Sequence, residues 1–508
     1  MRVLLRVDAS PDIGTGHAMR LQTLVGALRD YAPGTEAVFV ARHMPEALLG
    51  AIRAAGHAVH MLPGDGPEAG PGEYARWLGT TEEFDAAQVV GLAATLDGPV
   101  DRIVVDHYGL GAAWERAVSA ALDAPLWALD DLLRDHACDG MVDTTYGRDA
   151  ADYAAHVPED ATVLAGARFA LLRPGFAQAR EASLARQDAR GPVRNLLVSM
   201  GGMDDANASA RVLEAIEALD RADIHTHVML GAGAPHLEAV RAKAARMDAP
   251  VTVHAGVEDV PALLSQTDLC VGAAGSSTWE RCCLGVPTIN LVVADNQRTI
   301  ARNLSAIGAV RDGGTLDGFD ADTFAREHLA PLFDDVDARH ALSLASREIV
   351  DGRGAGRVAR EVALRLVPAT EDHIRIMFDW QSDPVTRAQS RNPEPPRWED
   401  HRAWSERRLS KPHERFYITE VAGEPSGVVR LEPREDGDYE ISVLVAPAAH
   451  GRGIGTASIR RILARHPRDT VHAFVKTTNP ASQRAFEKSG FIRVDAENFV
   501  RRGAAKPL

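Results

Sequence analysis

A histidine in a glycine-rich segment near the N-terminus is the first residue whose side chain suits acid–base chemistry. Residues 8–20 follow a β-branched stretch and place Gly14, Gly16 and His17 at the start of a helical pattern. Glycines let the backbone approach a ligand closely, and the free N–H groups at a helix N-terminus attract an anion. A dinucleotide-binding loop fits poorly, because the third glycine of that fingerprint is absent at the required spacing. His17 is therefore either a cap or surface residue, as most such histidines are, or a general base.

Two later segments offer backbone amides and hydroxyl groups that could stabilise a phosphate. Residues 199–204 and 272–280 each follow a predicted strand and lead into a predicted helix, where N–H groups are free. The expected phosphate donors are Gly201, Gly202, Ser276 and Ser277. Glu280, one turn into the second of these helices, could accept hydrogen bonds from both ribose hydroxyls of a nucleotide. The alternative, which is the commoner situation, is a first-turn glutamate that only complements the helix dipole.

A third glycine-rich turn, at residues 450–456, follows a strand near the C-terminus. This order resembles the GNAT acetyltransferase family, which places R/Q-x-x-G-x-G/A here, and residues 478–491 match the closing element of that family. The resemblance implies that successive amides cradle the pyrophosphate of acetyl-CoA while a splayed strand pairs with pantetheine. The residues expected to bind acetyl-CoA are Leu444, Val445, His450, Gly451, Arg452, Gly453, Gly455, Thr456 and Asn479.

Two positions depart from the GNAT pattern. His450 stands where Arg or Gln is usual, which changes one phosphate contact. Phe486 stands where many relatives carry a tyrosine that protonates the CoA thiolate. Because phenylalanine has no proton to donate, another group or solvent serves, or the domain has lost activity. Glu440 is the candidate base acting through water, and an exposed strand residue without a role is the alternative.

The first 360 residues resemble the PseG family of hydrolases of UDP-2,4-diacetamido-2,4,6-trideoxy-β-L-altropyranose. The matching segments are, in order, residues 6–20, 105–109, 130–139, 171–174, 199–204, 272–280 and 295–297. The resemblance implies a metal-independent site in which His17 activates water. We further expect Asp8 to orient His17, and Tyr108, Asn296 and Gln297 to contact the sugar. The chemistry fits, because UDP is a good leaving group and needs only one base of near-neutral pKa, with inversion at C1.

The elements that must position these residues predict an α/β fold. Helical patterns lie between β-branched stretches at residues 2–7, 37–41, 59–62, 102–106 and 125–130, and again between those at 194–200, 225–230, 251–254, 269–272 and 287–292. Strand–helix alternation predicts parallel, doubly wound sheets, with ligands beyond the carboxyl ends of the strands. Two such Rossmann-type halves facing each other form the GT-B architecture, which holds a nucleotide sugar between them.

The pattern changes near residue 364, which also marks a change in charge. The predicted order is then two helices, three antiparallel-looking strands at 415–421, 426–433 and 438–445, and a further helix–strand–helix–strand series, as in an α+β GNAT domain. Residues 364–508 hold 24 Lys/Arg and 20 Asp/Glu, a net charge of +4. The rest of the chain has a net charge of −19, and the two parts sum to −15 for the whole chain. The expected domains are residues 1–176, 190–360 and 364–508, with a linker helix in 177–193.

Composition narrows the expected partners and location. The net negative charge of the first part of the chain argues against binding of nucleic acid. The sequence lacks a run of about 18 apolar residues, so no membrane span is expected. Four cysteines lack metal or disulfide spacing, and the charged start does not resemble a signal peptide, so a reducing cytoplasm is expected. The two resemblances imply a UDP-linked amino sugar and acetyl-CoA as ligands, with no metal.

The two resemblances together predict a bifunctional enzyme of pseudaminic acid (nonulosonate) biosynthesis. A PseH-like GNAT domain would acetylate the 4-amino group of a UDP-amino sugar, and the PseG-like part would hydrolyse the product to free sugar and UDP. Two alternatives stay open: an inverting GT-B glycosyltransferase, or a hydrolase with a non-catalytic GNAT domain that senses acetyl-CoA. The sequence leaves the sugar stereochemistry, the acyl chain and the oligomeric state undetermined.

Overall fold

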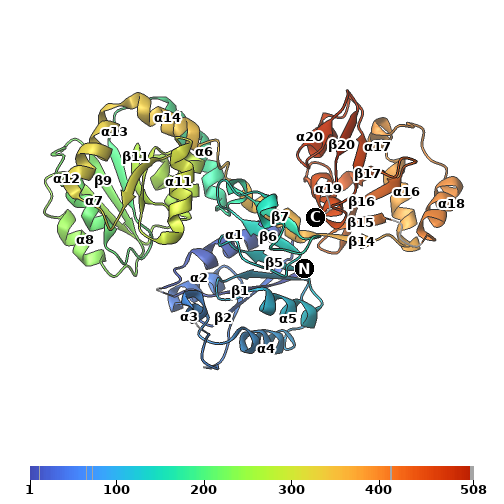
Figure 1. The fold of residues 1–508 in the computed structure, drawn as a ribbon, viewed down its shortest axis with the longest axis horizontal. Coiled ribbons are helices and arrows are strands. Elements are labelled where there is room, and N and C mark those ends of the chain that lie inside the picture. Colours follow the sequence, from blue (N-terminus) through green and yellow to red (C-terminus); the bar gives the residue numbers. More distant parts are fainter. Residues whose placement is uncertain (11, 65, 71, 412–414, 504–508) are drawn as a thin grey trace.

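Three β-sheets, each flanked by helices, follow one another along the chain (Figure 1). The computed structural model describes residues 1–10, 12–64, 66–70, 72–411 and 415–503. The unit built on the first sheet lies between the other two units in Figure 1. Within the described ranges, no helix combines the length and the apolar character needed to cross a membrane.

The first sheet has seven parallel strands in the order β3-β2-β1-β4-β5-β6-β7. Its strands are β1 (Arg2–Val7), β2 (Glu36–Ala41), β3 (Ala58–Met61), β4 (Arg102–Asp106), β5 (Leu126–Leu129), β6 (Gly140–Asp143) and β7 (Thr162–Ala165). Its helical segments are α1 (Gly16–Tyr31), α2 (Glu46–Ala54), α3 (Glu73–Leu78), α4 (Glu82–Ala93), α5 (Ala112–Leu122), η1 (Ala150–Tyr153) and η2 (Ala167–Phe169). The strand order reverses between β1 and β4, so their carboxyl ends form the switch point at which such sheets bind ligands.

The second sheet has six parallel strands in the order β10-β9-β8-β11-β12-β13. Its strands are β8 (Asn195–Ser199), β9 (His225–Leu230), β10 (Val251–Ala255), β11 (Leu269–Ala273), β12 (Thr288–Val292) and β13 (Arg311–Thr315). Its helical segments are α6 (Pro174–Asp188), α7 (Ala208–Glu217), α8 (Leu237–Ala244), α9 (Val260–Ser265), α10 (Ser277–Leu284), η3 (Asp295–Gln297), α11 (Arg298–Ala306), α12 (Ala321–Phe324), η4 (Ala325–Leu329), α13 (Ala330–Asp334) and α14 (Val336–Ser346). Its switch point lies between β8 and β11.

Two helices pack differently from the expected division of the chain. α6, which overlaps the predicted linker helix, packs against α9 and α10 and so forms part of the second unit. α15 (Gly354–Ala363) was expected to end the second unit, but it packs against α1 of the first. The reason is its apolar face, because Val358, Ala359 and Val362 are fully buried in the core that also holds α1. The chain therefore returns to the first unit before it leaves.

The third sheet runs β14-β15-β16-β17-β18-β20-β19 and is mostly antiparallel. Its strands are β14 (Leu364–Pro368), β15 (Arg415–Val421), β16 (Glu424–Pro433), β17 (Tyr439–Val445), β18 (Val471–Phe474), β19 (Ile492–Arg493) and β20 (Asn498–Arg501). Its helical segments are η5 (Glu371–His373), α16 (Ile374–Ser382), α17 (Pro384–Gln389), α18 (Trp398–Leu409), η6 (Pro447–Ala449), α19 (Ile454–Arg465) and α20 (Pro480–Glu487). β17 and β18 are parallel and pair only at Tyr439↔Val471 and Glu440↔His472 in the described chain, after which they diverge.

The third unit is held directly against the first. α15 ends at Ala363 and β14 begins at the next residue, so no linker separates them. Nε of Arg102 on β4 donates to the carbonyl oxygen of Val362 at 2.8 Å. The guanidinium of Arg461 on α19 lies 5.2 Å from the ring centroid of Trp127 on β5. One continuous hydrophobic cluster contains side chains from both units, so the two share a core.

Candidate active sites

His17 lies at the start of α1 and faces the last residue of β4. Nδ1 of His17 is 2.6 Å from Oδ1 of Asp106, and the imidazole is 12% exposed. Because the carboxylate can only accept, Nδ1 carries the proton and Nε2 keeps its lone pair. In the described part of the chain, Nε2 has no hydrogen-bond partner. The ring is thus oriented as a general base would be.

Arg20 fixes the carboxylate that holds His17. Its Nε and Nη2 donate to the two oxygens of Asp106, each at 2.5 Å. Burial alone would raise the pKa of Asp106, but Arg20 and His17 hold it well below its usual range. The carboxylate therefore stays ionised, and its charge stabilises the imidazolium that forms when Nε2 takes up a proton.

Asp8 does not orient His17, contrary to the sequence prediction. It is fully buried, and its carboxylate is 2.7 Å from Nη1 of Arg6 and accepts the N–H of Arg42 at 2.6 Å. The reason is strand alternation: Arg6 and Asp8 share the face of the sheet opposite to Val7. α1 covers the Val7 face, and Asp106 is the register partner of Val7. Asp106 is therefore the carboxylate on the side of His17.

Tyr108 completes the wall around the imidazole. Its ring lies edge-on to His17 with centroids 4.9 Å apart, and it stacks on Trp77 at 5.7 Å. Its hydroxyl donates to Asp131 at 2.5 Å. Burial, followed by the charge of Asp131, raises the pKa of Tyr108, so the phenol stays protonated. The hydroxyl proton of Tyr108 is already donated to Asp131. The contact of Tyr108 with a sugar stays a prediction.

The loop after β11 brings the second unit to the His17 segment. Nη2 of Arg281, fully buried, donates to the carbonyl oxygen of Ala273 at 2.7 Å and to Oδ1 of Asn290 at 3.1 Å. A Cβ on Gly272 would lie 2.7 Å from Cζ of Arg281, so only glycine leaves room for this brace. Across the two units, a Cβ on Gly16 would lie 3.9 Å from Oγ of Ser276. The structure therefore brings together two of the predicted glycine-rich segments.

Glu280 lies on α10, three residues after Ser277. It is part-buried, and burial raises its pKa to about 7 although Arg173 and Arg281 lower it. Perturbed pKa values of this kind gather at functional sites. The assignment of Glu280 to ribose remains a prediction.

The other predicted contacts of the second unit surround the same loop. Gly201 has φ of 104°, and the carbonyl oxygen of Gly202 accepts the N–H of Gly231 at 2.8 Å, which fixes the turn after β8. Nε2 of Gln297 lies 3.7 Å from the Cβ position of Gly275. Asn296 is exposed. β8 pairs with β11, so the turn and the loop occupy neighbouring strand ends.

The predicted acetyl-CoA residues gather where β17 and β18 diverge. Leu444 and Val445 end β17, and Gly451 and Gly453 have φ of 77° and 75° in the loop before α19. α19 starts without a side-chain N-cap, so its first N–H groups, with Gly455 and Thr456 in the first turn, are not capped by a side chain. Asn479 has a structural task, because its Oδ1 accepts the N–H of Ser482 at 3.1 Å as the N-cap of α20.

The surroundings of Glu440 and Phe486 are compatible with both alternatives drawn from the sequence, an active and an inactive acetyltransferase domain. Glu440 is 30% exposed and lies 2.9 Å from Nη1 of Arg391, so its carboxylate is ion-paired. Phe486 is buried and packs edge-on against Phe491, with centroids 5.0 Å apart. Phe486 therefore fills the core, and the thiolate of CoA would have to take its proton from elsewhere.

Asp106 and Arg20 are the functional candidates that sequence reasoning missed. Both lie in segments that match the PseG family, but the sequence does not say which of several aspartates reaches His17. The available signal was the position of Asp106 at the carboxyl end of β4, next to β1.

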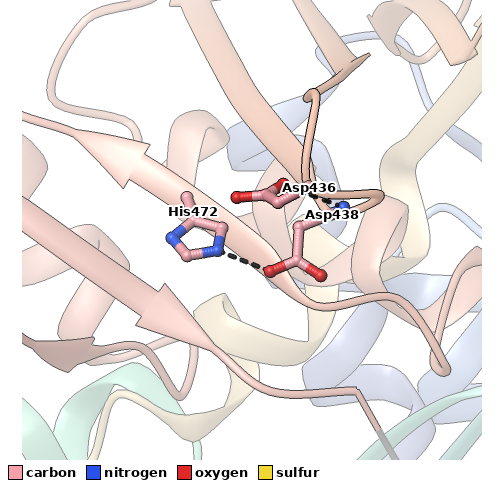
Figure 2. Close-up of side chains that lie close together, drawn as sticks. All are labelled: Asp436, Asp438 and His472. Carbon is pink, nitrogen blue, oxygen red and sulfur yellow. Dashed lines mark hydrogen bonds and ion pairs between the residues drawn. The ribbon is translucent and has the colours of Figure 1, made fainter.

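Asp436, Asp438 and His472 form the one group in the described residues whose side chains converge like metal ligands (Figure 2). Nε2 of His472 is 2.8 Å from Asp438, and Asp436 is ion-paired with Arg434 at 3.2 Å. These internal partners already satisfy the side chains, and Asp436 is exposed, so the group is explained without a ligand.

Comparisons with known proteins agree with the two parts of the chain. Residues 363–492 match the model of the acetyltransferase (GNAT) domain family. The spore coat polysaccharide biosynthesis protein SpsG of Bacillus subtilis is 28% identical over 204 residues, which span 40% of this chain and only 58% of that relative. The UDP-2,4-diacetamido-2,4,6-trideoxy-β-L-altropyranose hydrolase of Campylobacter jejuni is 22% identical over 206 residues, 41% of this chain and 71% of that protein.

The fold of the first two units has a solved counterpart. The crystal structure of MurG from Acinetobacter baumannii superposes with a TM-score of 0.52 at 14% identity, and covers 71% of this chain and 98% of that one. The likeness confirms the predicted architecture of two Rossmann-like units. The chain thus joins a PseG-like region with the GT-B fold to a C-terminal GNAT acetyltransferase domain.

Proposed function

We propose that this chain is a bifunctional enzyme of pseudaminic acid biosynthesis that acetylates a UDP-linked amino sugar and then hydrolyses the product. The acetyl acceptor would be the 4-amino group of the UDP-sugar, and the hydrolase substrate would be UDP-2,4-diacetamido-2,4,6-trideoxy-β-L-altropyranose. The observation that carries the proposal is the pair of His17 and Asp106, 2.6 Å apart beside the Ser276 loop. The GNAT domain in the same chain supports the acetylation step.

Hydrolysis follows from the orientation of His17. Nε2 removes a proton from a water molecule while the water oxygen forms a bond to C1 of the sugar. The bond from C1 to the phosphate oxygen breaks at the same time, UDP leaves with that electron pair, and C1 is inverted. Asp106 stabilises the imidazolium until the proton returns to solvent. Donors at Ser276 and Ser277 would stabilise the charge that develops on the departing pyrophosphate.

Acetyl transfer would take place where β17 and β18 diverge. The sugar amine attacks the thioester carbonyl, the C–N bond forms, and the C–S bond breaks to release CoA thiolate. Glu440 would accept the amine proton through water, provided that it separates from Arg391. Because Phe486 has no proton to give, the thiolate takes one from solvent.

A coupled assay tests both halves. Mass spectrometry of the full chain with the UDP-4-amino-sugar and acetyl-CoA should show free diacetamido sugar and UDP. His17→Ala should stop at the acetylated UDP-sugar, because only the second step needs the base. Failure to form any acetylated sugar while CoA still binds would favour a CoA-sensing domain. Sugar transfer that requires an added acceptor would favour a glycosyltransferase and overturn the hydrolase proposal.

A further inference from the structure

Arg360 lies against the glycine-rich loop that begins α19, although it belongs to the chain that precedes the GNAT match. α15, which carries it, ends at Ala363, and the family model matches residues 363–492. A Cβ built on Gly453 would stand 3.1 Å from Cζ of Arg360, so the guanidinium rests directly on the loop backbone. Gly453 also has φ of 75°, which favours glycine. The loop is thus shaped to accept an arginine from another unit.

The loop's own polar side chains are engaged by the protein itself. Nε2 of His450 is 3.0 Å from the carbonyl oxygen of Val445. Nη2 of Arg452 donates to the carbonyl oxygen of Tyr31, the last residue of α1, at 2.6 Å, and the Tyr31 hydroxyl donates back to the carbonyl oxygen of Arg452 at 3.2 Å. One nitrogen of each side chain is therefore already engaged with a carbonyl oxygen of the protein.

Arg360, which lies beside this loop, also lacks a close acidic partner in the described residues. Its Nη2 is 4.0 Å from Oε1 of Glu361, and that same oxygen is 3.2 Å from Nη1 of Arg460. Among the described residues, Nε of Arg360 is buried and has no hydrogen-bond partner, and the side chain is 15% exposed. A buried Nε without a hydrogen-bond partner costs free energy, and an oxyanion bound to the guanidinium would recover part of that cost.

We propose that Arg360 binds the pyrophosphate of acyl-CoA, so that a residue of the preceding region completes the donor site of the acetyltransferase. This inference rests on the proposed function, in which acyl-CoA is the donor. A guanidinium matches two phosphate oxygens at once, and the glycine-rich turn adds backbone N–H groups to the same anion. The charge that His450 does not supply at its motif position would then come from α15.

Calorimetric titration of the full chain tests the assignment with two probes, CoA and pantetheine, which lacks the pyrophosphate and nucleotide. Arg360→Ala should weaken CoA binding about 10- to 100-fold and leave pantetheine binding unchanged. Arg360→Lys should fall between the two proteins, because a single ammonium group keeps the charge without the fork. Arg365→Ala, an exposed arginine on β14, is the matched control and should bind CoA as the wild type does.

The outcomes separate three explanations. Equal CoA affinity in wild type and Arg360→Ala overturns the proposal, and so does an equal loss of CoA and pantetheine binding, which would mean that Arg360 only shapes the loop. Wild-type protein that binds no CoA overturns the proposed donor instead, and this inference with it. If Arg360→Ala fails to fold, as judged by thermal unfolding, Arg360→Gln and Arg360→Lys decide on the same two criteria.

Discussion

At the scale of single residues, the proposed hydrolysis depends on which nitrogen of His17 carries the proton. Asp106→Asn should lower kcat for UDP release by about 10³-fold or more, because the amide can donate to Nδ1 and move the imidazole proton to Nε2. The base would then have no lone pair facing the water. Steady-state release of UDP from the diacetamido sugar measures this, with thermal unfolding to verify the fold.

Asp8→Asn is the matched control for that substitution. Asp8 is equally buried, but its ion pair with Arg6 is on the other face of the sheet. Its loss should lower the melting temperature while kcat of the folded protein stays within a few-fold of wild type. A larger loss of kcat in Asp8→Asn than in Asp106→Asn would show that the roles are reversed.

The carboxylate of Glu280 should make nucleoside binding depend on pH. Because its pKa is about 7, the ionised form, which would accept from ribose hydroxyls, is lost as the pH falls below about 7. Uridine is the probe, because it has no phosphate that titrates in this range. Its Kd should rise about fivefold from pH 7 to pH 6 in the wild type and stay flat in Glu280→Gln. A wild-type Kd that is flat over this range would leave Glu280 as a first-turn glutamate without a ligand.

At the scale of elements, His136 ties α5 to the end of β5. It lies 2.6 Å from Glu115 and 3.5 Å from Asp130, with 2% of its side chain exposed. Burial lowers its pKa, but hydrogen bonds to Asp130 and Glu115 raise it to about 9. Because this lies above the usual histidine pKa of 6.5, the stabilisation is complete below pH 6.5 and is lost as the pH rises through about 9.

The size of this effect follows from the shift in pKa. Wild type should exceed His136→Gln in free energy of unfolding by about 3 kcal/mol at pH 6, and the difference should shrink by pH 9.5. Guanidinium denaturation at the two pH values measures it. A difference independent of pH would mean that the imidazole contributes by packing rather than by charge.

The sequence predicted the strands that carry a β-branched pattern and missed strands that lack one. β1 has the expected range, and α1 begins at Gly16, where the helical pattern was expected to start, because both periodicities are clear there. β6 (Gly140–Asp143) has only two apolar residues, and β13 (Arg311–Thr315) has none, so neither carries a strand pattern. Such strands are stabilised by their neighbours in the sheet, which local sequence does not report.

In the candidate sites, the sequence predicted the residues of the glycine-rich motifs better than the charged side chains that contact them. His17, Gly16 and Ser276 were recognised by motif, and the structure places them together. Asp106 reaches His17 through pairing between β1 and β4, and Arg360 reaches Gly453 through packing of α15 on α19. Both contacts join residues far apart in the chain, so no local spacing could reveal them.

At the scale of the whole molecule, α1 connects the two candidate sites. His17 is near its start, and Tyr31 at its end bonds to Arg452 in the loop of the third unit. A helix of 16 residues is about 24 Å long, which sets the separation of the two ends. Because the two ends of one rigid helix lie at the two candidate sites, the distance that the acetylated sugar would travel from one site to the other is fixed.

This shared framework predicts how the native protein resists protease. Trypsin should spare the chain at Arg360 and Arg365, because α15 is buried against α1 and β14 is paired with β15 from Leu364↔Val421 to Pro368↔Tyr417. The first cut should instead follow Arg391 or Arg397, both exposed in the proline-rich segment between α17 and α18. Mass spectrometry of timed digests identifies the fragments. Early release of an intact fragment that begins after residue 360 or 365 would show that the first and third units are joined by an accessible tether, and the shared core across α15 would then be wrong.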